Sequence, residues 1–228
     1  MRIQLIHPPH PAAIDDRLDA PLGLLRIATV LKEAGHEVAI ADYTGHHSPP
    51  IMKADVYGLT CYAPTVHLSS LIAKGCRKWN PEAVTVAGGA HITGLLECGE
   101  KELLPRGFDS YVAGDGELAM LDLIDDWPDV KRTYEHPLPG DLNEMPMTDY
   151  SFVDLESYGR TIAGGPSVPI YTSIGCPYRC AFCGLPKQHR KIKHRSPQNV
   201  ANEIEDIINI YGIRSFNFQD DTFLLDKA

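Results

Sequence analysis

The sequence predicts a doubly wound α/β domain with a parallel sheet, followed by one βαβ unit of a second domain. Up to residue 126, short apolar segments of strand type alternate with segments of helix type. This alternation is typical of parallel strands joined by right-handed crossovers. The alternation stops over residues 127–167, which are rich in proline, and resumes at residue 168. These observations divide the chain into a domain at 1–126, a linker at 127–167 and a unit at 168–228.

Five strands and four helices are expected in the first domain. The first helix, at residues 21–34, has Pro21 in its first turn and Gly35 just past its end, which is the usual placement of both residue types. The segment 83–87 is a short continuous apolar run, which is consistent with a buried strand. The other expected strands are 2–7, 37–41, 55–60 and 109–113, and the other helices are 64–79, 95–104 and 117–126.

The segments that follow these strands are the expected ligand contacts, because ligands of open α/β sheets bind beyond the carboxyl ends of the strands. Most of the ends carry glycine, proline or small polar residues, which allow a ligand to approach the backbone closely. The segments are Pro8-Pro9, Asp42, Thr60-Cys61-Tyr62, Gly88-Gly89-Ala90-His91 and Gly114-Asp115-Gly116-Glu117. The last one continues as G-x-G-x-x-A, but it follows the fifth strand rather than the first. Its position argues against a nicotinamide or flavin dinucleotide.

The second unit begins with an expected strand at residues 168–174. A helix follows at 196–212, with Ser196 as its N-cap and Pro197 at its first position, and another strand at 213–218. In the linker, apolar residues are expected to anchor the chain to a domain surface. These residues are Phe152, Val153, Leu155 and Tyr158.

Composition narrows the class of protein. The chain is 43% hydrophobic and 22% charged, the balance of a folded globular protein rather than a disordered one. No apolar run approaches the roughly 20 residues of a membrane helix, and the N-terminus does not resemble a signal peptide. We therefore expect a cytoplasmic location and reduced cysteines.

Charge is unevenly distributed along the chain, although the net charge is −9. Residues 171–202 contain no acid and six lysines or arginines. Such a segment suits an anionic cofactor or a solvated basic face. A nucleic-acid partner is not expected, because few aromatic residues are interleaved and the rest of the chain is acidic.

The densest chemical motif is C-x3-C-x2-C, formed by Cys176, Cys180 and Cys183 directly after the strand expected at 168–174. Three thiolates in one short loop can converge on an inorganic centre, and three ligands on a four-iron cluster leave one iron open. A zinc site with His189 as the fourth ligand is the alternative. The other cysteines are expected to be buried apolar thiols; they are Cys61, Cys76 and Cys98.

The segment Cys176-Pro177-Tyr178-Arg179-Cys180-Ala181-Phe182-Cys183 resembles the signature of the radical S-adenosylmethionine (SAM) enzymes, and the resemblance continues through residues 195–200 and 218–223. Upstream, the segments at 21–24, 35–38, 88–91 and 114–117 resemble the cobalamin-binding domain of the cobalamin-dependent branch of that family. The resemblance implies a Rossmann-like cobalamin-binding domain followed by the first βαβ unit of a partial (β/α)6 barrel.

By position, the resemblance implies that Cys176, Cys180 and Cys183 are the catalytic ligands of a [4Fe–4S] cluster. SAM would bind the open iron and undergo reductive cleavage to a 5′-deoxyadenosyl radical. Phe182 is expected near the adenine, and Asp220 or Asp221 is expected to accept a hydrogen bond from the methionine ammonium. A small-molecule substrate and an electron donor of flavodoxin or ferredoxin type are the implied partners.

For cobalamin, the resemblance implies contacts from the strand ends. The residues concerned are Thr60, Cys61, Gly88, Gly89, His91, Gly114, Asp115, Gly116 and Glu117. Many other cobalamin proteins carry D-x-H-x-x-G, whose histidine ligates cobalt, but here position 89 is glycine rather than aspartate. Cobalamin is therefore expected to bind without a histidine on its lower face.

The expected function is that of a cobalamin-dependent radical SAM enzyme, for methyl transfer to an unreactive centre or for a radical cyclisation or rearrangement. The alternative is a cobalamin carrier or sensor whose cysteine loop is not catalytic. About 60 residues follow Val168, fewer than six βα units require. We therefore expect the N-terminal part of a longer enzyme, incomplete for turnover by itself.

Overall fold

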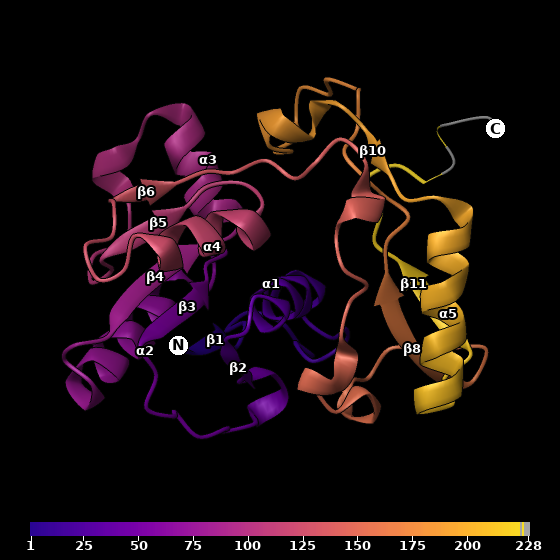
Figure 1. Cartoon of the computed structure of the whole chain (residues 1–228), viewed down its shortest axis with the longest axis horizontal. Coiled ribbons are helices and arrows are strands. Elements are labelled where there is room, and N and C mark those ends of the chain that lie inside the picture. Colours follow the sequence, from indigo (N-terminus) through magenta and orange to yellow (C-terminus); the bar gives the residue numbers. More distant parts are fainter. Residues whose placement is uncertain (224, 226–228) are drawn as a thin grey trace.

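The computed structural model describes residues 1–223 and residue 225 (Figure 1). Its larger part is a 6-stranded sheet in the order β2-β1-β3-β4-β5-β6, and all its strands are parallel. The strands are β1 (Arg2–His7), β2 (Glu37–Asp42), β3 (Val56–Thr60), β4 (Val84–Gly88), β5 (Ser110–Val112) and β6 (Thr133–Tyr134). The order reverses at β1, which makes the region beyond β1 and β3 a topological switch point, where ligands of such sheets bind.

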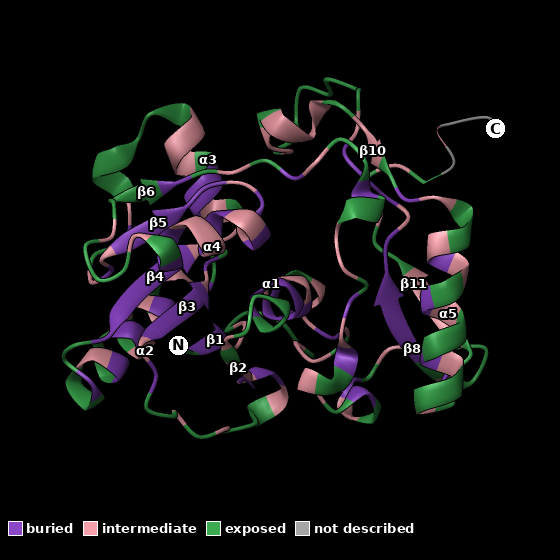
Figure 2. Cartoon of the chain, in the orientation of Figure 1, coloured by how far each residue is buried: buried purple, intermediate pink, exposed green. Residues whose placement is uncertain are grey.

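Helices cover both faces of this sheet, as the sequence predicts. One core cluster joins α1 (Leu22–Glu33) and α4 (Gly116–Asp125) to one face. The other joins α2 (Val66–Trp79) and α3 (Ala90–Cys98) to the opposite face. The strands are the most continuously buried part of the domain (Figure 2).

Two features of this domain differ from the sequence prediction. Helix α3 spans Ala90–Cys98 rather than 95–104, because the turn at Gly89 is tight enough to start the helix at once and left-handed Gly99 ends it. The sixth strand lies in the expected linker, where Thr133 and Tyr134 pair with Tyr111 and Val112. Two residues are too few to produce a recognisable strand pattern.

The second unit contains β8 (Gly165–Ile170), α5 (Pro197–Tyr211) and β11 (Ser215–Phe218), and its strands pair in parallel. The short β7 (Thr161–Ile162) pairs antiparallel with β8, and β9 (Ser173–Ile174) pairs antiparallel with β10 (Lys193–His194). The predicted strand at 168–174 is thus wrong at both ends. The chain leaves the sheet after Ile170, where the backbone and hydroxyl of Thr172 bond to Asp220 instead.

The segment between the two units is packed rather than loose. It forms three 3-10 turns, η3 (Leu142–Glu144), η4 (Tyr150–Phe152) and η5 (Leu155–Ser157), each preceded by an aspartate whose side chain accepts a backbone N–H bond. The expected anchors Leu155 and Tyr158 are buried, and Phe152 and Val153 are half-buried. Together they join α1 to β8 and α5 in a third core cluster, so α1 lies between the two sheets (Figure 1).

Among the residues that the structure describes, no helix has both the length and the apolar character that crossing a membrane requires.

Candidate cofactor site

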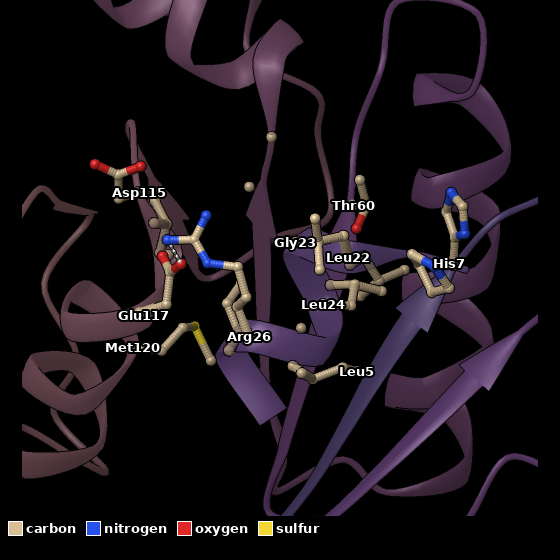
Figure 3. Close-up of a pocket in the computed structure, with 18 of the residues that line it drawn as sticks. Leu5, His7, Leu22, Gly23, Leu24, Arg26, Thr60, Asp115, Glu117 and Met120 are labelled. Atoms are coloured by element: carbon tan, nitrogen blue, oxygen red, sulfur yellow. Dashed lines mark ion pairs between the residues drawn. The ribbon is translucent and has the colours of Figure 1, made fainter. Parts of the chain in front are cut away.

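A cavity of about 480 Å³ lies over the carboxyl ends of β1, β3, β4 and β5 (Figure 3). This volume is within the range of roughly 300–1,000 Å³ that is typical of small-molecule sites. Most of the wall comes from the first domain, and Pro169 and Gln219 contribute from the second unit. The cavity is therefore shared between the two parts of the chain.

The structure places most of the predicted strand-end residues on this cavity. Those that line it are Thr60, Tyr62, Gly88, Gly89, Gly114, Asp115, Gly116 and Glu117, whereas Pro8, Pro9 and Asp42 do not. Cys61 and His91 do not line it. Cys61 packs into the core on the opposite face of the sheet, and burial raises the pKa of its thiol to about 11. Side chains alternate across a strand, so two adjacent residues at a strand end face opposite sides.

Glycine shapes both the floor and the mouth of the cavity. A Cβ at Gly58 would lie 2.9 Å from Cδ2 of Leu5, and one at Gly116 would lie 2.5 Å from Cδ1 of Ile27. These two glycines let apolar side chains close the floor. A Cβ at Gly23, at the exposed mouth, would meet no atom within 4 Å. An apolar floor with open space above it suits an organic group larger than a metal ion.

A buried ion pair forms one wall, where Arg26 of α1 lies 2.5 Å from Glu117 of α4 (Figure 3). Burial raises the pKa of the Glu117 carboxyl, and the guanidinium beside it acts in the opposite direction. The Arg26 guanidinium also lies over the Tyr171 ring, 4.4 Å from its centroid. Arg195 lies 4.8 Å from the same centroid and pairs with buried Glu203.

Sequence reasoning missed Arg26 and His7 as cavity residues. His7 is the last residue of β1, so the rule that ligands bind at strand ends could have found it. Its Nδ1 lies 3.4 Å from the carboxylate of Asp42, which is itself buried. An arginine among the apolar residues of the first two turns of α1 was the available signal for Arg26.

The cysteine loop, residues 175–191, contacts the cavity wall through the bond between His189 and Asp115, and much of the loop is exposed. Cys176 is half-buried, whereas Cys180 and Cys183 are exposed. Phe182, expected near an adenine, is 93% exposed. Within residues 1–223 and 225, no three His, Cys, Asp or Glu side chains gather in an arrangement that could hold a metal ion. The structure therefore places the three thiols on one loop without bringing them together.

The other cysteines differ in environment. Cys61 and Cys76 are buried, as expected, and burial raises the pKa of each to about 11. The expectation for Cys98 is wrong, because this residue is exposed at the last position of α3. A helix end that projects beyond the sheet has no core to bury its side chain.

The two aspartates that follow β11 bond to the start of the cysteine loop. Asp220 accepts bonds from the Thr172 amide at 2.8 Å and from the Ser173 hydroxyl at 2.7 Å. Asp221 accepts a bond from the Gly175 amide at 2.8 Å. Both carboxylates thus fix the chain that leads into Cys176.

His189, the fourth ligand of the zinc alternative, is engaged elsewhere. Its Nε2 lies 2.8 Å from Oδ1 of Asp115. Burial lowers the pKa of this histidine, but the Asp115 carboxylate outweighs burial, and the net direction is upward. Nε2 is thus engaged with the first domain rather than with the three thiols.

Comparison with known proteins finds a family model for each of the two parts of the chain. The model of the B12 binding domain matches residues 20–124, and the model of the radical SAM superfamily matches residues 170–228. The chain belongs to the B12-binding branch of the radical SAM superfamily. Its first domain is the Rossmann-like B12-binding domain, and its second unit is the first βαβ unit of the radical SAM domain.

Relatives of this family match the whole chain. An uncharacterized methyltransferase from Pyrococcus horikoshii is 28% identical over 100% of this chain and 55% of its own length. The anaerobic magnesium-protoporphyrin IX monomethyl ester cyclase from Synechocystis is 29% identical over 100% of this chain and 51% of its own length. The chain thus spans about half the length of these curated relatives.

A solved structure has the same fold. The radical SAM methyltransferase TsrM from Kitasatospora setae, with cobalamin and a [4Fe–4S] cluster bound, superposes with a TM-score of 0.67. The match covers 97% of this chain and 49% of that chain, at 19% sequence identity. The packing of the second unit against the first domain is therefore an arrangement that a solved family member also has.

Proposed function

We propose that this chain belongs to an enzyme that uses cobalamin and a [4Fe–4S] cluster to cleave SAM reductively, for methyl transfer to an unreactive centre or for a radical cyclisation. The observation that carries the proposal is the shared cavity. It lies at the switch point of the B12-binding domain, and Gln219, directly after β11, lines it. A group bound there would lie beside Asp115, which lines the cavity and bonds to His189 of the cysteine loop. A carrier or sensor, the alternative function, would not require this adjacency.

The residues present suit cobalamin. The nucleotide tail would occupy the apolar floor between the sheet and α1, and the proposed contacts are Thr60 and the glycines at 88, 89, 114 and 116. Gly88, Gly89 and Gly116 place no side chain between the backbone and a phosphate, whereas the N–H of Gly114 already donates to Thr93 at 2.9 Å. Arg26 and Glu117 neutralise each other in the wall, so an uncharged heterocycle would not face an unpaired charge.

The donor set also suits an iron–sulfur cluster, because three thiols on one exposed loop are the ligands that such clusters take. We propose Cys176, Cys180 and Cys183 as these ligands. When bound, the reduced cluster supplies the electron that cleaves SAM, and cobalamin supplies a carrier for a methyl group. Asp220 and Asp221 hold the chain before Cys176, and exposed Phe182 offers a ring for an adenine to stack on.

An electron donor of flavodoxin or ferredoxin type is part of this proposal, since the cluster must be reduced for each cleavage. We also propose a cytoplasmic location, which agrees with six free cysteines that need a reducing compartment.

The cluster assignment is tested by anaerobic reconstitution with iron and sulfide. Cys180→Ser should lose most bound iron, whereas Cys98→Ser should retain it. Cys98 is the matched control because it is exposed like Cys180 but lies in α3. Full iron content in Cys180→Ser, or stoichiometric zinc without iron in the wild-type protein, would contradict the assignment.

The cobalamin assignment is tested at the cavity mouth. Gly23→Phe should weaken cobalamin binding at least about tenfold, because its ring would enter open space over the cavity. Gly75→Phe is the control, since Gly75 is also an exposed helical glycine with no atom near its added Cβ. Titration followed by absorbance measures both. Equal affinity for cobalamin in the two variants would contradict the assignment of cobalamin to this cavity.

A further inference from the structure

The cysteine loop is fastened to the B12-binding domain by the short turn η6 (Lys187–Arg190). His189 bonds to Asp115 at 2.8 Å, and Gln188 donates to the other oxygen of the same carboxylate at 3.3 Å. The backbone N–H of Lys187 donates to Glu97 of α3 at 2.7 Å. One carboxylate of the first domain therefore holds two consecutive side chains of the loop.

The conformation of the Gly114–Asp115 turn serves this contact. Gly114 has a φ of +71°, and a Cβ there would lie 1.8 Å from Nε2 of Gln188. Asp115 occupies the N-cap position of α4, yet its side chain makes no capping bond to that helix. An aspartate at this position ordinarily caps its own helix. Here its carboxylate is turned to the cysteine loop instead.

The turn η6 also contacts the first cysteine, Cys176, directly. The N–H of Cys176 donates to the carbonyl of His189 at 2.8 Å. Gly175 packs so closely that a Cβ there would lie 2.7 Å from that carbonyl oxygen and 2.5 Å from that of Lys191. The position of Cys176 thus depends on residues 189–191, and Asp115 fixes the ring of His189.

We propose that Asp115 is a positioning residue for the cysteine loop, acting through His189 and Gln188 to fix Cys176. The importance of this role for catalysis rests on the proposed function, but the positioning itself is a property of the chain without a cofactor. The turn at 114–117 then has two roles, because it borders the cavity and also positions the cysteine loop.

The primary experiment measures alkylation of each cysteine by N-ethylmaleimide in the cofactor-free protein. In Asp115→Ala, Cys176 should react about tenfold faster than in the wild type, because a lost charge-assisted bond favours local opening. Cys98 is the internal reference and should not change. Asp115→Asn, which retains an acceptor, should recover much of the protection.

Asp122→Ala is the matched control, because Asp122 lies in the same helix and also has a histidine partner, His136, at 2.8 Å. It should leave Cys176 unchanged. Should Asp115→Ala fail to fold, His189→Ala breaks the same bond from the loop side and carries the same expectations. An unchanged Cys176 rate, or an equal rise in Asp122→Ala, would overturn the proposal.

A spectroscopic readout separates positioning from general destabilisation. In reconstituted Asp115→Ala with normal iron content, the electron paramagnetic resonance spectrum of the reduced cluster should broaden or show more than one species. An identical spectrum would count against positioning. If the wild-type protein takes up no iron at all, the proposed function fails, while the alkylation rates still decide the role of Asp115.

Discussion

Asp42, at the end of β2, is a buried carboxylate that links three distant segments. It accepts a bond from the Tyr158 hydroxyl at 2.7 Å, and Arg17 lies 3.2 Å from the same oxygen. Burial alone would raise the pKa of Asp42, but the bonds from His7, Tyr158 and Thr44 outweigh it and hold the pKa below its usual value. Because the folded pKa is depressed, this carboxylate stabilises the fold above its unfolded pKa near 3.9.

Asp42→Asn should therefore reduce the free energy of unfolding by about 3 kcal/mol at pH 7, because it leaves the half-buried Arg17 without its counter-charge. The difference from wild type should shrink as the pH falls from about 5 to 3, because the unfolded chain then takes up a proton at this carboxyl that folded Asp42 does not. Urea denaturation at both pH values measures this. Asp129→Asn, at an exposed carboxylate, should change little, and a constant difference across the pH range would contradict the assignment.

At the scale of elements, α3 has one glycine at its N-cap, Gly89, and another within the helix, Gly94, and only the first position requires glycine. Gly89 has a φ of +101°, and its added Cβ would lie 3.0 Å from the carbonyl oxygen of Cys61. Gly94, within the same helix, has a negative φ and open space around it. The first glycine is required by backbone geometry, and the second only lowers helix propensity.

Gly89→Ala should consequently destabilise the protein by about 1–3 kcal/mol, whereas Gly94→Ala should stabilise it by about 0.5–1 kcal/mol. Thermal unfolding of the two variants measures the contrast. A stabilising Gly89→Ala would show that the turn into α3 can relax.

Elements whose ends are marked by capping residues could be predicted from the sequence, and elements without such residues could not. Helix α5 begins at Pro197 after its N-cap Ser196 and ends before Gly212, as expected. Strand β6 was missed because long-range pairing, rather than periodicity, creates it. In the site, topology predicts the glycines at the strand ends, but the bond between Asp115 and His189 joins residues 74 apart in the sequence. No local pattern encodes such a contact.

At the scale of the whole molecule, the two sheets differ in their number of strands and in the helices that pack on them. The first has 6 strands with helices on both faces, whereas α5 covers a sheet that has 3 strands within residues 1–223 and 225. A smaller sheet buries less apolar area for each residue that is ordered.

The amides of α5 should accordingly exchange with deuterium faster than those of α2. Hydrogen-exchange mass spectrometry of the metal-free protein compares the two helices directly. Equal or slower exchange in α5 would mean that the turns η4 and η5 and helix α1 support it as fully as a larger sheet would.

Tyr171, whose ring contacts both Arg26 and Arg195, has a consequence for recombining parts of related proteins. The outer partners of the two arginines, Glu117 and Glu203, balance the charge, so this buried row belongs half to each unit. A chimera that joins the first domain of one relative to the second unit of another would inherit half of the row from each parent. Each ion pair lies within one unit and would pass intact into the hybrid, so the contact at risk is that of Arg26 with Tyr171. Where the parents differ at either position, the two should be transplanted together.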